Sequence, residues 1–318
     1  MAEQIRVLVL GYGEMGHAIE YLIKSGNQYR QLKKTSECQQ EITLQIWDKY
    51  PERGFKSVNL EESVPQADLV FFCLPVNPHR EIAEQISPLL KKGSICLSIA
   101  KGLDEAGQTA AEIFSDVFMS ENNPQKFALM YGPMISEEIC AGRFAFAQLA
   151  CSDNESFYKI SKLFEGTRFY LEQAYDIPGI SWSVILKNVY AMIFGMADEL
   201  KLGDNMRGYL SFAALRELDQ IVRKKGGELG SPYHLAGLGD LITTGTSEDS
   251  HHHELGRMLA RGEIQNISGE GVHTLEMVRK YQIIDTTDYP LFELTESIVR
   301  DPSDVNTSIN EYLIKVFN

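Results

Sequence analysis

Two lysines of this chain lie where a charged side chain calls for a chemical explanation. Lys187 is embedded in VILKNVYAM, an apolar run of helical spacing, and Lys101 directly follows the strand-like segment ICLSIA. A buried lysine needs a partner, and burial lowers its pKa towards neutral pH, which suits general acid/base catalysis. Asp240 could orient such an ammonium group, with capping of a helix as its alternative role. Solvated surface positions are the alternative for both lysines.

A glycine motif near the N-terminus predicts a second kind of site. Gly11, Gly13 and Gly16 form G-x-G-x-x-G between the strand-like IRVLVL and the helix-like HAIEYLIKS. In this context the glycines permit a tight turn, close approach of a pyrophosphate and packing of the helix, whose N-terminus faces the phosphates. An ordinary strand-to-helix turn is the alternative. The loop residues expected at a dinucleotide are Gly11, Tyr12, Gly13, Glu14, Met15 and Gly16.

Asp48 bears on which dinucleotide is bound. It ends the next strand-like run, ITLQIWD, where a carboxylate can accept hydrogen bonds from the ribose hydroxyls and repel a 2′-phosphate, which favours NAD. The connection from Gly16 is longer than the usual spacing of about 20 residues, and the adjacent Lys49 could serve NADP. A solvated loop carboxylate is the alternative.

The order of the expected elements indicates two domains. Up to residue 176, short apolar runs alternate with helix-like segments, which predicts an α/β Rossmann domain with a doubly wound, mostly parallel sheet. The expected strands are IRVLVLG, ITLQIWD, ADLVFFCLP, GSICLSIA, FALMYGP, FAQLACS and RFYLEQ. After Pro178-Gly179 the apolar residues recur at helical spacing, so residues 177–318 are expected to form an all-helical substrate domain.

Composition narrows the class of protein. The 318 residues carry 44 acidic and 30 basic side chains, a net charge of −14 that repels a nucleic-acid backbone. The same charge means that an anionic substrate needs a local cluster of lysine or arginine. No apolar run of about 18 residues and no basic leader appear, so we expect a cytoplasmic protein without membrane insertion. The five cysteines lack a C-x-x-C pair and are expected to be reduced.

Several further motifs occur in a characteristic order: FCLPVNPHRE, SIAKGL, YGPMISEE, ILKNVYAM, GDNMRG, GLGDLITTGT and GEGV. Together they resemble the NAD(P)-dependent glycerol-3-phosphate dehydrogenase family, from Gly11 to about Pro290. LKN, GLGDL and EGV spaced across a helical domain are not general Rossmann features. The resemblance implies hydride transfer between NAD(P)H and dihydroxyacetone phosphate or sn-glycerol 3-phosphate, which supplies phospholipid synthesis. A homodimer is expected from the base rate for soluble enzymes.

The resemblance also implies roles for individual residues. Lys187 matches the catalytic lysine, and Asp240 with Thr244 would complete the reacting centre beside Asn188. Lys101 would face both nicotinamide and substrate. At the cofactor, the resemblance adds Pro75 and Glu270.

One segment departs from the family. Where bacterial members carry Ser-Arg-Asn, whose arginine and asparagine hold the substrate phosphate, this chain has Ser250-His251-His252. Neutral imidazoles do not replace the permanent charge and bidentate geometry of arginine, although Arg207 or Arg257 could compensate. We expect the triple histidine from His251 to be solvent-exposed and not to bind a metal. The alternatives are therefore a divergent dehydrogenase of another small anionic ketone or alcohol, or a dinucleotide-binding regulatory protein.

Overall fold

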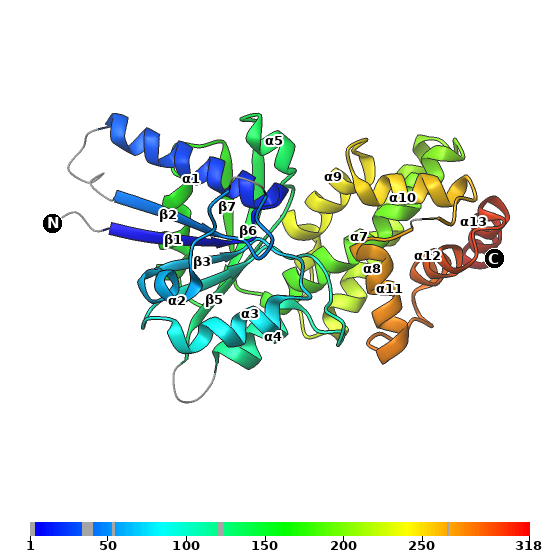
Figure 1. The fold of residues 1–318 in the computed structure, drawn as a ribbon. Helices are drawn as coiled ribbons and strands as arrows, with labels where there is room; N and C mark the ends of the chain where they lie inside the picture. Colours follow the sequence, from blue (N-terminus) through cyan, green and yellow to red (C-terminus); the bar gives the residue numbers. More distant parts are fainter. Residues whose placement is uncertain (1–3, 34–40, 53–54, 120–123, 266) are drawn as a thin grey trace. The chain divides into compact units, whose positions relative to one another are not determined.

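The computed structural model describes residues 4–33, 41–52, 55–119, 124–265 and 267–318. The chain divides into two compact units, the first formed by Met1–Ala100 with Ala110–Ile177 and the second by Lys101–Thr109 with Pro178–Asn318 (Figure 1). The change of unit near residue 177 lies close to the boundary expected from sequence. The segment Lys101–Thr109 was not expected in the second unit. Lys101 consequently shares a unit with Lys187 and Asp240.

The first unit is built on a seven-stranded sheet in the described residues, with the order β2-β1-β3-β4-β5-β6-β7. Neighbouring strands are parallel except β5 and β6, which pair antiparallel. Every strand expected from sequence is present, which confirms the Rossmann prediction. The strands are β1 (Gln4–Leu10), β2 (Glu41–Trp47), β3 (Leu69–Phe72), β4 (Ile95–Ser98), β5 (Lys126–Tyr131), β6 (Ala145–Cys151) and β7 (Phe169–Ala174).

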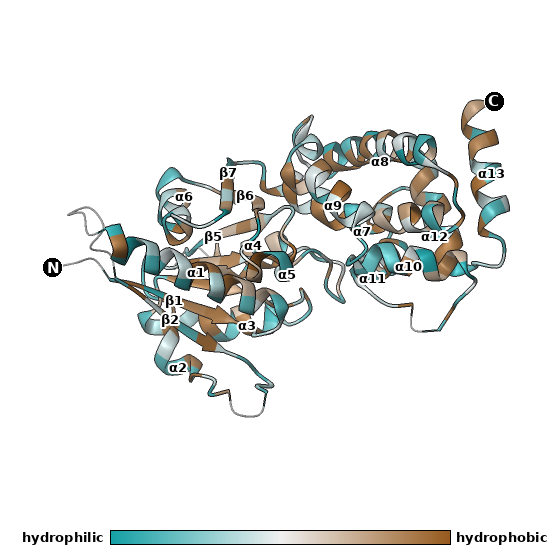
Figure 2. Ribbon diagram, turned by 90° about the horizontal axis from the view of Figure 1, so that it is seen from above, coloured by the Kyte–Doolittle hydropathy of each residue, from teal (hydrophilic) through white to brown (hydrophobic). Residues whose placement is uncertain are grey.

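Helices cover both faces of this sheet (Figure 1). On one face lie α1 (Glu14–Lys33) and α5 (Ser136–Cys140), and on the other lie α3 (His79–Ile86) and α4 (Ala110–Phe118). Shorter connections contain α2 (Leu60–Ser63) and α6 (Asn154–Ser161). Ile19 and Leu22 of α1 pack against strand residues such as Val9, and the strands are hydrophobic along their length (Figure 2). The inner strands β3 and β4 are buried on both faces, which explains their continuous apolar runs, whereas the edge strands β2 and β7 include exposed residues.

From Pro178 onward, the described residues of the second unit form helices and connecting loops, as expected, whereas the segment Lys101–Thr109 contains an isolated β-bridge between Leu103 and Thr109. Its central helix α7 (Ile177–Glu199) has the length and hydropathy of a membrane span, but the whole apolar window is buried inside the protein. A five-residue π-helical turn, Leu235–Gly239, leads into α9 (Asp240–Thr246). The remaining helices are α8 (Asp204–Lys224), α10 (His251–Ala260), α11 (Glu270–Tyr281), α12 (Pro290–Arg300) and α13 (Val305–Phe317).

Two glycines let α7 and α10 pack at very short range. A Cβ atom on Gly195 would lie 1.9 Å from the carbonyl oxygen of His253, and one on Gly256 would lie 1.9 Å from that of Met192. Any larger residue would push the helices apart. The start of α10 is therefore held in a fixed place relative to the C-terminal part of α7.

Candidate active site

A carboxylate between two lysines forms the centre of the second unit. The Oδ2 atom of Asp240 lies 2.8 Å from Nζ of Lys101 and 3.1 Å from Nζ of Lys187. Asp240 and Lys187 are 2% and 3% exposed, whereas Lys101 is partly exposed. The sequence expectation that these three side chains converge is met within this unit. Asp240 binds the lysines through its side chain; the alternative, side-chain capping of its helix, is not observed.

Three further predicted residues complete this cluster. The ammonium group of Lys187 also donates a hydrogen bond to Oγ1 of Thr244. Nδ2 of Asn188 donates to Oε2 of Glu270 at 3.1 Å and to the carbonyl oxygen of Lys101 at 3.0 Å. Its Oδ1 atom is buried and has no hydrogen-bond partner among the described residues. That acceptor is available to a hydroxyl or amide group of a ligand.

Local structure explains how these side chains meet. Lys187 and Asn188 are consecutive on the buried helix α7, while Asp240 begins α9 directly after the π-helical turn. Helical turns of this type are frequent at functional sites because they re-aim a side chain.

The segment that carries Lys101 has its own anchors. The Oδ1 atom of Asp104 accepts hydrogen bonds from the N–H groups of Ala106 and Gln108, and Tyr281 donates through its hydroxyl to the carbonyl of Glu105. These hydrogen bonds close the segment into a turn and attach it to α11.

Burial sets the protonation behaviour of the cluster. Desolvation is the main cause that lowers the pKa of Lys187 to about 8; Asp240 opposes this shift, and the charge of Lys101 adds to it. Burial also raises the pKa of Glu270, although both lysines pull it down. A lysine with this pKa can release and recover a proton near neutral pH, as general acid/base catalysis requires.

The histidines at the start of α10 are not equivalent. His251 is exposed, as expected, and its Nε2–H donates to the carbonyl of Ser268 at 2.7 Å. His252 is partly buried, and its Nδ1 atom has no hydrogen-bond partner in the described chain. The expectation of exposure is wrong for His253, which is 4% exposed and donates through Nε2 to Asp198 at 2.8 Å. Its burial follows from the close packing of α10 on α7.

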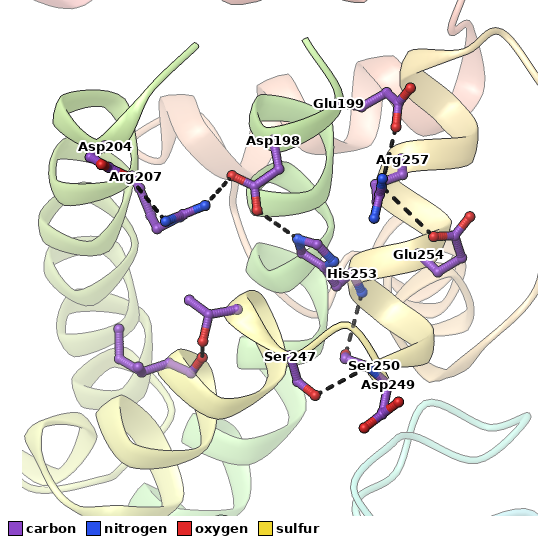
Figure 3. A network of polar contacts seen from close by, with 12 residues as sticks. Asp198, Glu199, Asp204, Arg207, Ser247, Asp249, Ser250, His253, Glu254 and Arg257 are labelled. Carbon is purple, nitrogen blue, oxygen red and sulfur yellow. Dashed lines mark hydrogen bonds and ion pairs between the residues drawn. The ribbon is translucent and has the colours of Figure 1, made fainter. Parts of the chain in front are cut away.

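Arg207 and Arg257, which could compensate for the missing arginine of the Ser-Arg-Asn segment, form ion pairs with carboxylates (Figure 3). Arg207 pairs with Asp198 at 2.7 Å and with Asp204 at 3.1 Å. Arg257 lies 3.1 Å from Glu199. An anion at either guanidinium would therefore have to share it with these carboxylates.

In the first unit, the glycine loop has the features of a phosphate cradle. Gly11 has φ +93°, and a Cβ atom there would lie 2.5 Å from the carbonyl oxygen of Cys73. A Cβ atom on Gly16 would lie 2.3 Å from the carbonyl oxygen of Gly11. A Cβ atom on Gly13 meets nothing within 4 Å, so this position faces open space. Glu14 and Met15 begin α1 beside that space, and the loop fits a dinucleotide pyrophosphate.

Asp48 is attached to this loop rather than left solvated. Its two carboxylate oxygens accept hydrogen bonds from the N–H groups of Tyr12 and Tyr50, both at 2.7 Å. The ring of Tyr12 stacks on Phe55 with centroids 4.4 Å apart, a contact that sequence did not indicate. Lys49 lies 3.2 Å from Glu81 on the surface.

Pro75 follows β3 and is held by a residue that sequence reasoning missed. Nδ1–H of the buried His79 donates to the carbonyl of Pro75 at 2.8 Å, and Nε2 lies 2.8 Å from Oγ of Ser98. Burial lowers the pKa of His79 to about 4, so the ring is neutral and accepts from the serine hydroxyl. The spacing of Pro75 and His79 in PVNPH was the available signal for this support.

Comparison with known proteins places this geometry in a family. Residues 6–157 match the model described as NAD-dependent glycerol-3-phosphate dehydrogenase N-terminus, and residues 176–310 match the corresponding C-terminus. The chain is 30% identical to the glycerol-3-phosphate dehydrogenase [NAD(P)+] of Teredinibacter turnerae, over 88% of this chain and 86% of that protein. It is 27% identical to that of Saccharophagus degradans, over 97% and 90%.

Solved structures agree on the fold. The glycerol-3-phosphate dehydrogenase of Coxiella burnetii has a TM-score of 0.78 at 22% identity, with 98% of this chain and 99% of that one covered. The enzyme from Saccharomyces cerevisiae has the same TM-score at 19% identity and the same coverage. Because the two family models match residues 6–157 and 176–310 and a relative is 30% identical over 88% of the chain, this chain belongs to the NAD-dependent glycerol-3-phosphate dehydrogenase family.

Proposed function

We propose that this protein transfers a hydride between NAD(P)H and dihydroxyacetone phosphate, forming sn-glycerol 3-phosphate for phospholipid synthesis. The observation that carries the proposal is the buried contact of Asp240 with both Lys187 and Lys101. Reduction of a ketone needs one group that gives a proton to the oxygen and one that stabilises its negative charge. The two lysines supply both, and Asp240 holds them together.

Lys187 is the proposed general acid and base. When the carbonyl carbon is reduced, its oxygen takes a proton from the ammonium group of Lys187, the C=O π bond is lost and an O–H bond forms. In the reverse direction the neutral amine accepts the hydroxyl proton. A pKa of about 8 makes both forms accessible near neutral pH. The hydrogen bond to Thr244 directs the ammonium group.

Lys101 is proposed to stay charged and to stabilise the substrate oxygen. Its partial exposure allows a ligand to reach the ammonium group while Asp240 retains it. Asn188 offers its unpartnered Oδ1 to a substrate hydroxyl, and Glu270 keeps the amide in that orientation. His251 and His252 are the proposed contacts to the anionic end.

In the first unit, the residues proposed to bind the cofactor are the glycine loop, Asp48 and Pro75. In the second unit, Lys101 and Glu270 are proposed cofactor contacts on the family resemblance alone. Bound nicotinamide supplies or accepts the hydride. Asp48 supports NAD over NADP because its carboxylate would repel a 2′-phosphate, while Lys49 is paired with Glu81. We further propose a cytoplasmic enzyme that forms homodimers and does not insert into the membrane.

The test is a panel of small ketones assayed with NADH and NADPH. We expect oxidation of NADH that depends on dihydroxyacetone phosphate and is abolished in Lys187→Ala. Lys280→Ala, which removes an exposed lysine of the same unit, is the matched control and should retain activity. No turnover with dihydroxyacetone phosphate would refute the proposal. Turnover with a different anionic ketone would favour the divergent dehydrogenase that the changed segment at His251 suggests.

A further inference from the structure

The N-terminus of α10 presents unpartnered donors beside the lysine cluster. Ser250 caps the helix by accepting a hydrogen bond from the N–H of His253, and its carbonyl accepts from Glu254. Within the described chain, the N–H groups of His251 and His252 have no acceptor. Unpaired N–H groups and the helix dipole make such an end attractive to an anion.

His252 is a second and independent observation at the same place. Its Nδ1 atom is buried, and no described residue forms a hydrogen bond with it. Burial, and then the charges of Lys187, His251 and Lys101, lower the pKa of this imidazole to about 3. The ring is therefore neutral in the free protein and offers one N–H donor and one acceptor nitrogen.

The charges around His252 do not by themselves match a phosphate dianion. On α7, α9, α11 and the segment 101–109, the two ammonium groups of Lys101 and Lys187 face the carboxylates of Asp240 and Glu270, so their formal charges cancel. On α10, Nε2–H of His251 is occupied by the carbonyl of Ser268. The nearby arginines are paired with carboxylates, as Figure 3 shows. A dianion would thus arrive at a site without net positive charge, and a proton taken up from solvent would offset part of its charge.

We propose that His252 and the anionic end of the substrate share one proton, which the complex takes up from solvent when a phosphate dianion binds at the N-terminus of α10. The inference rests on the proposed function. The proton lies between a ring nitrogen of His252 and a phosphate oxygen. Imidazolium with dianion and imidazole with monoanion are the two descriptions of the same complex, and both contain one proton more than the free partners. No bond to carbon changes in this step.

Proton uptake can be counted by titration calorimetry at pH 7 in several buffers of different ionisation enthalpy. Dihydroxyacetone phosphate is titrated into the protein saturated with NAD⁺, which carries no hydride to transfer. The phosphate group of unbound dihydroxyacetone phosphate has a second pKa of about 6 and is about nine-tenths dianionic at pH 7, so we expect the complex to take up about 0.9 proton on binding. Lys187 is already about nine-tenths protonated at pH 7 and can contribute only about 0.1 proton.

His252→Arg is the decisive variant because it supplies a permanent charge. Proton uptake by this variant should fall to about 0.1. In wild type, binding with a shared proton requires the affinity for dihydroxyacetone phosphate to fall about tenfold per pH unit above pH 7, and this fall should be absent in His252→Arg. His234→Arg, which adds the same charge at an exposed histidine of the same unit, should keep the wild-type proton count.

The outcomes separate this inference from the proposed function. Saturable binding with uptake of less than about 0.3 proton overturns the inference alone, as does an undiminished uptake in His252→Arg. Absence of dihydroxyacetone phosphate binding in both wild type and His252→Arg overturns both proposals.

Discussion

Replacement of Lys187 by methionine should increase stability at neutral pH while it abolishes activity. Lys187 is 3% exposed, and its pKa falls from the ordinary 10.5 to about 8, chiefly through burial. Methionine has a similar length and no charge. In the variant, Asp240 keeps Lys101 as its partner. Loss of the hydrogen bond to Thr244 changes the free energy of unfolding by an amount that does not depend on pH.

The magnitude follows from the two pKa values of Lys187. Each unit of pKa difference corresponds to about 1.4 kcal/mol, so holding this ammonium group charged in the folded state costs about 3 kcal/mol at pH 7 and less than about 1 kcal/mol at pH 10. The folded pKa is below the unfolded one, hence the unfolded chain binds more protons between about pH 8 and 10.5. Wild-type stability contributed by this group therefore rises with pH. The free energy of unfolding of wild type minus that of Lys187→Met should rise by about 2.5 kcal/mol from pH 7 to pH 10.

The assay is urea unfolding followed by tryptophan fluorescence in a Trp47→Phe background. Trp182 then reports alone, and it lies five residues before Lys187 on the same helix. Lys280→Met removes an exposed lysine and should show a constant difference from wild type over the same pH range. A difference that is also constant for Lys187→Met would refute the argument that burial controls this lysine.

Four other substitutions test three separate parts of the structure. Gly13→Val should leave the fold intact, because a Cβ atom there meets nothing within 4 Å, but it should weaken NADH binding about tenfold in a fluorescence titration. Gly16→Ala should instead lower the urea midpoint of the first unit, because its Cβ atom would lie 2.3 Å from the carbonyl oxygen of Gly11. Asp240→Asn removes the carboxylate between two ammonium groups, so the pKa of Lys187 should fall below 8 and the alkaline limb of kcat/KM should move to lower pH; an unmoved limb contradicts this role. His79→Phe removes the hydrogen bonds of the imidazole to the Pro75 carbonyl and to the buried Ser98 hydroxyl, and it should lower the free energy of unfolding by about 1 to 3 kcal/mol, measured by urea denaturation.

Periodicity predicted the elements well because each depends on neighbouring residues. The inner strands β3 and β4 are buried on both faces, and their apolar runs are visible in sequence. The antiparallel pairing of β5 with β6 was not predictable in the same way, since an apolar run carries no information on its direction. Membership of Lys101–Thr109 in the second unit was also hidden, because the contact of Lys101 with Asp240 joins residues 139 positions apart.

Sequence identified the residues of the lysine cluster better than the side chains that support them. Lys187 was recognisable because a charge in the middle of an apolar helix needs a partner. The partners of Arg207 and Arg257 were not, since each depends on how separate helices pack. The role of His79 was similarly hidden, because its ring contacts the chain before its own helix and a serine on the next strand.

The structure separates the residues proposed to react from those proposed to contact the anion. Lys187, Asn188 and Asp240 belong to α7 and α9, where burial fixes their protonation, whereas His251 and His252 occupy the first turn of α10. The glycine contacts between α7 and α10 hold that turn in place without using either histidine side chain. Substitution in the first turn of α10 can therefore alter the charge presented to a ligand while the lysine pair keeps its geometry. On the proposed roles, the chain can therefore keep the residues proposed to react and still differ from its family at the proposed anion contact.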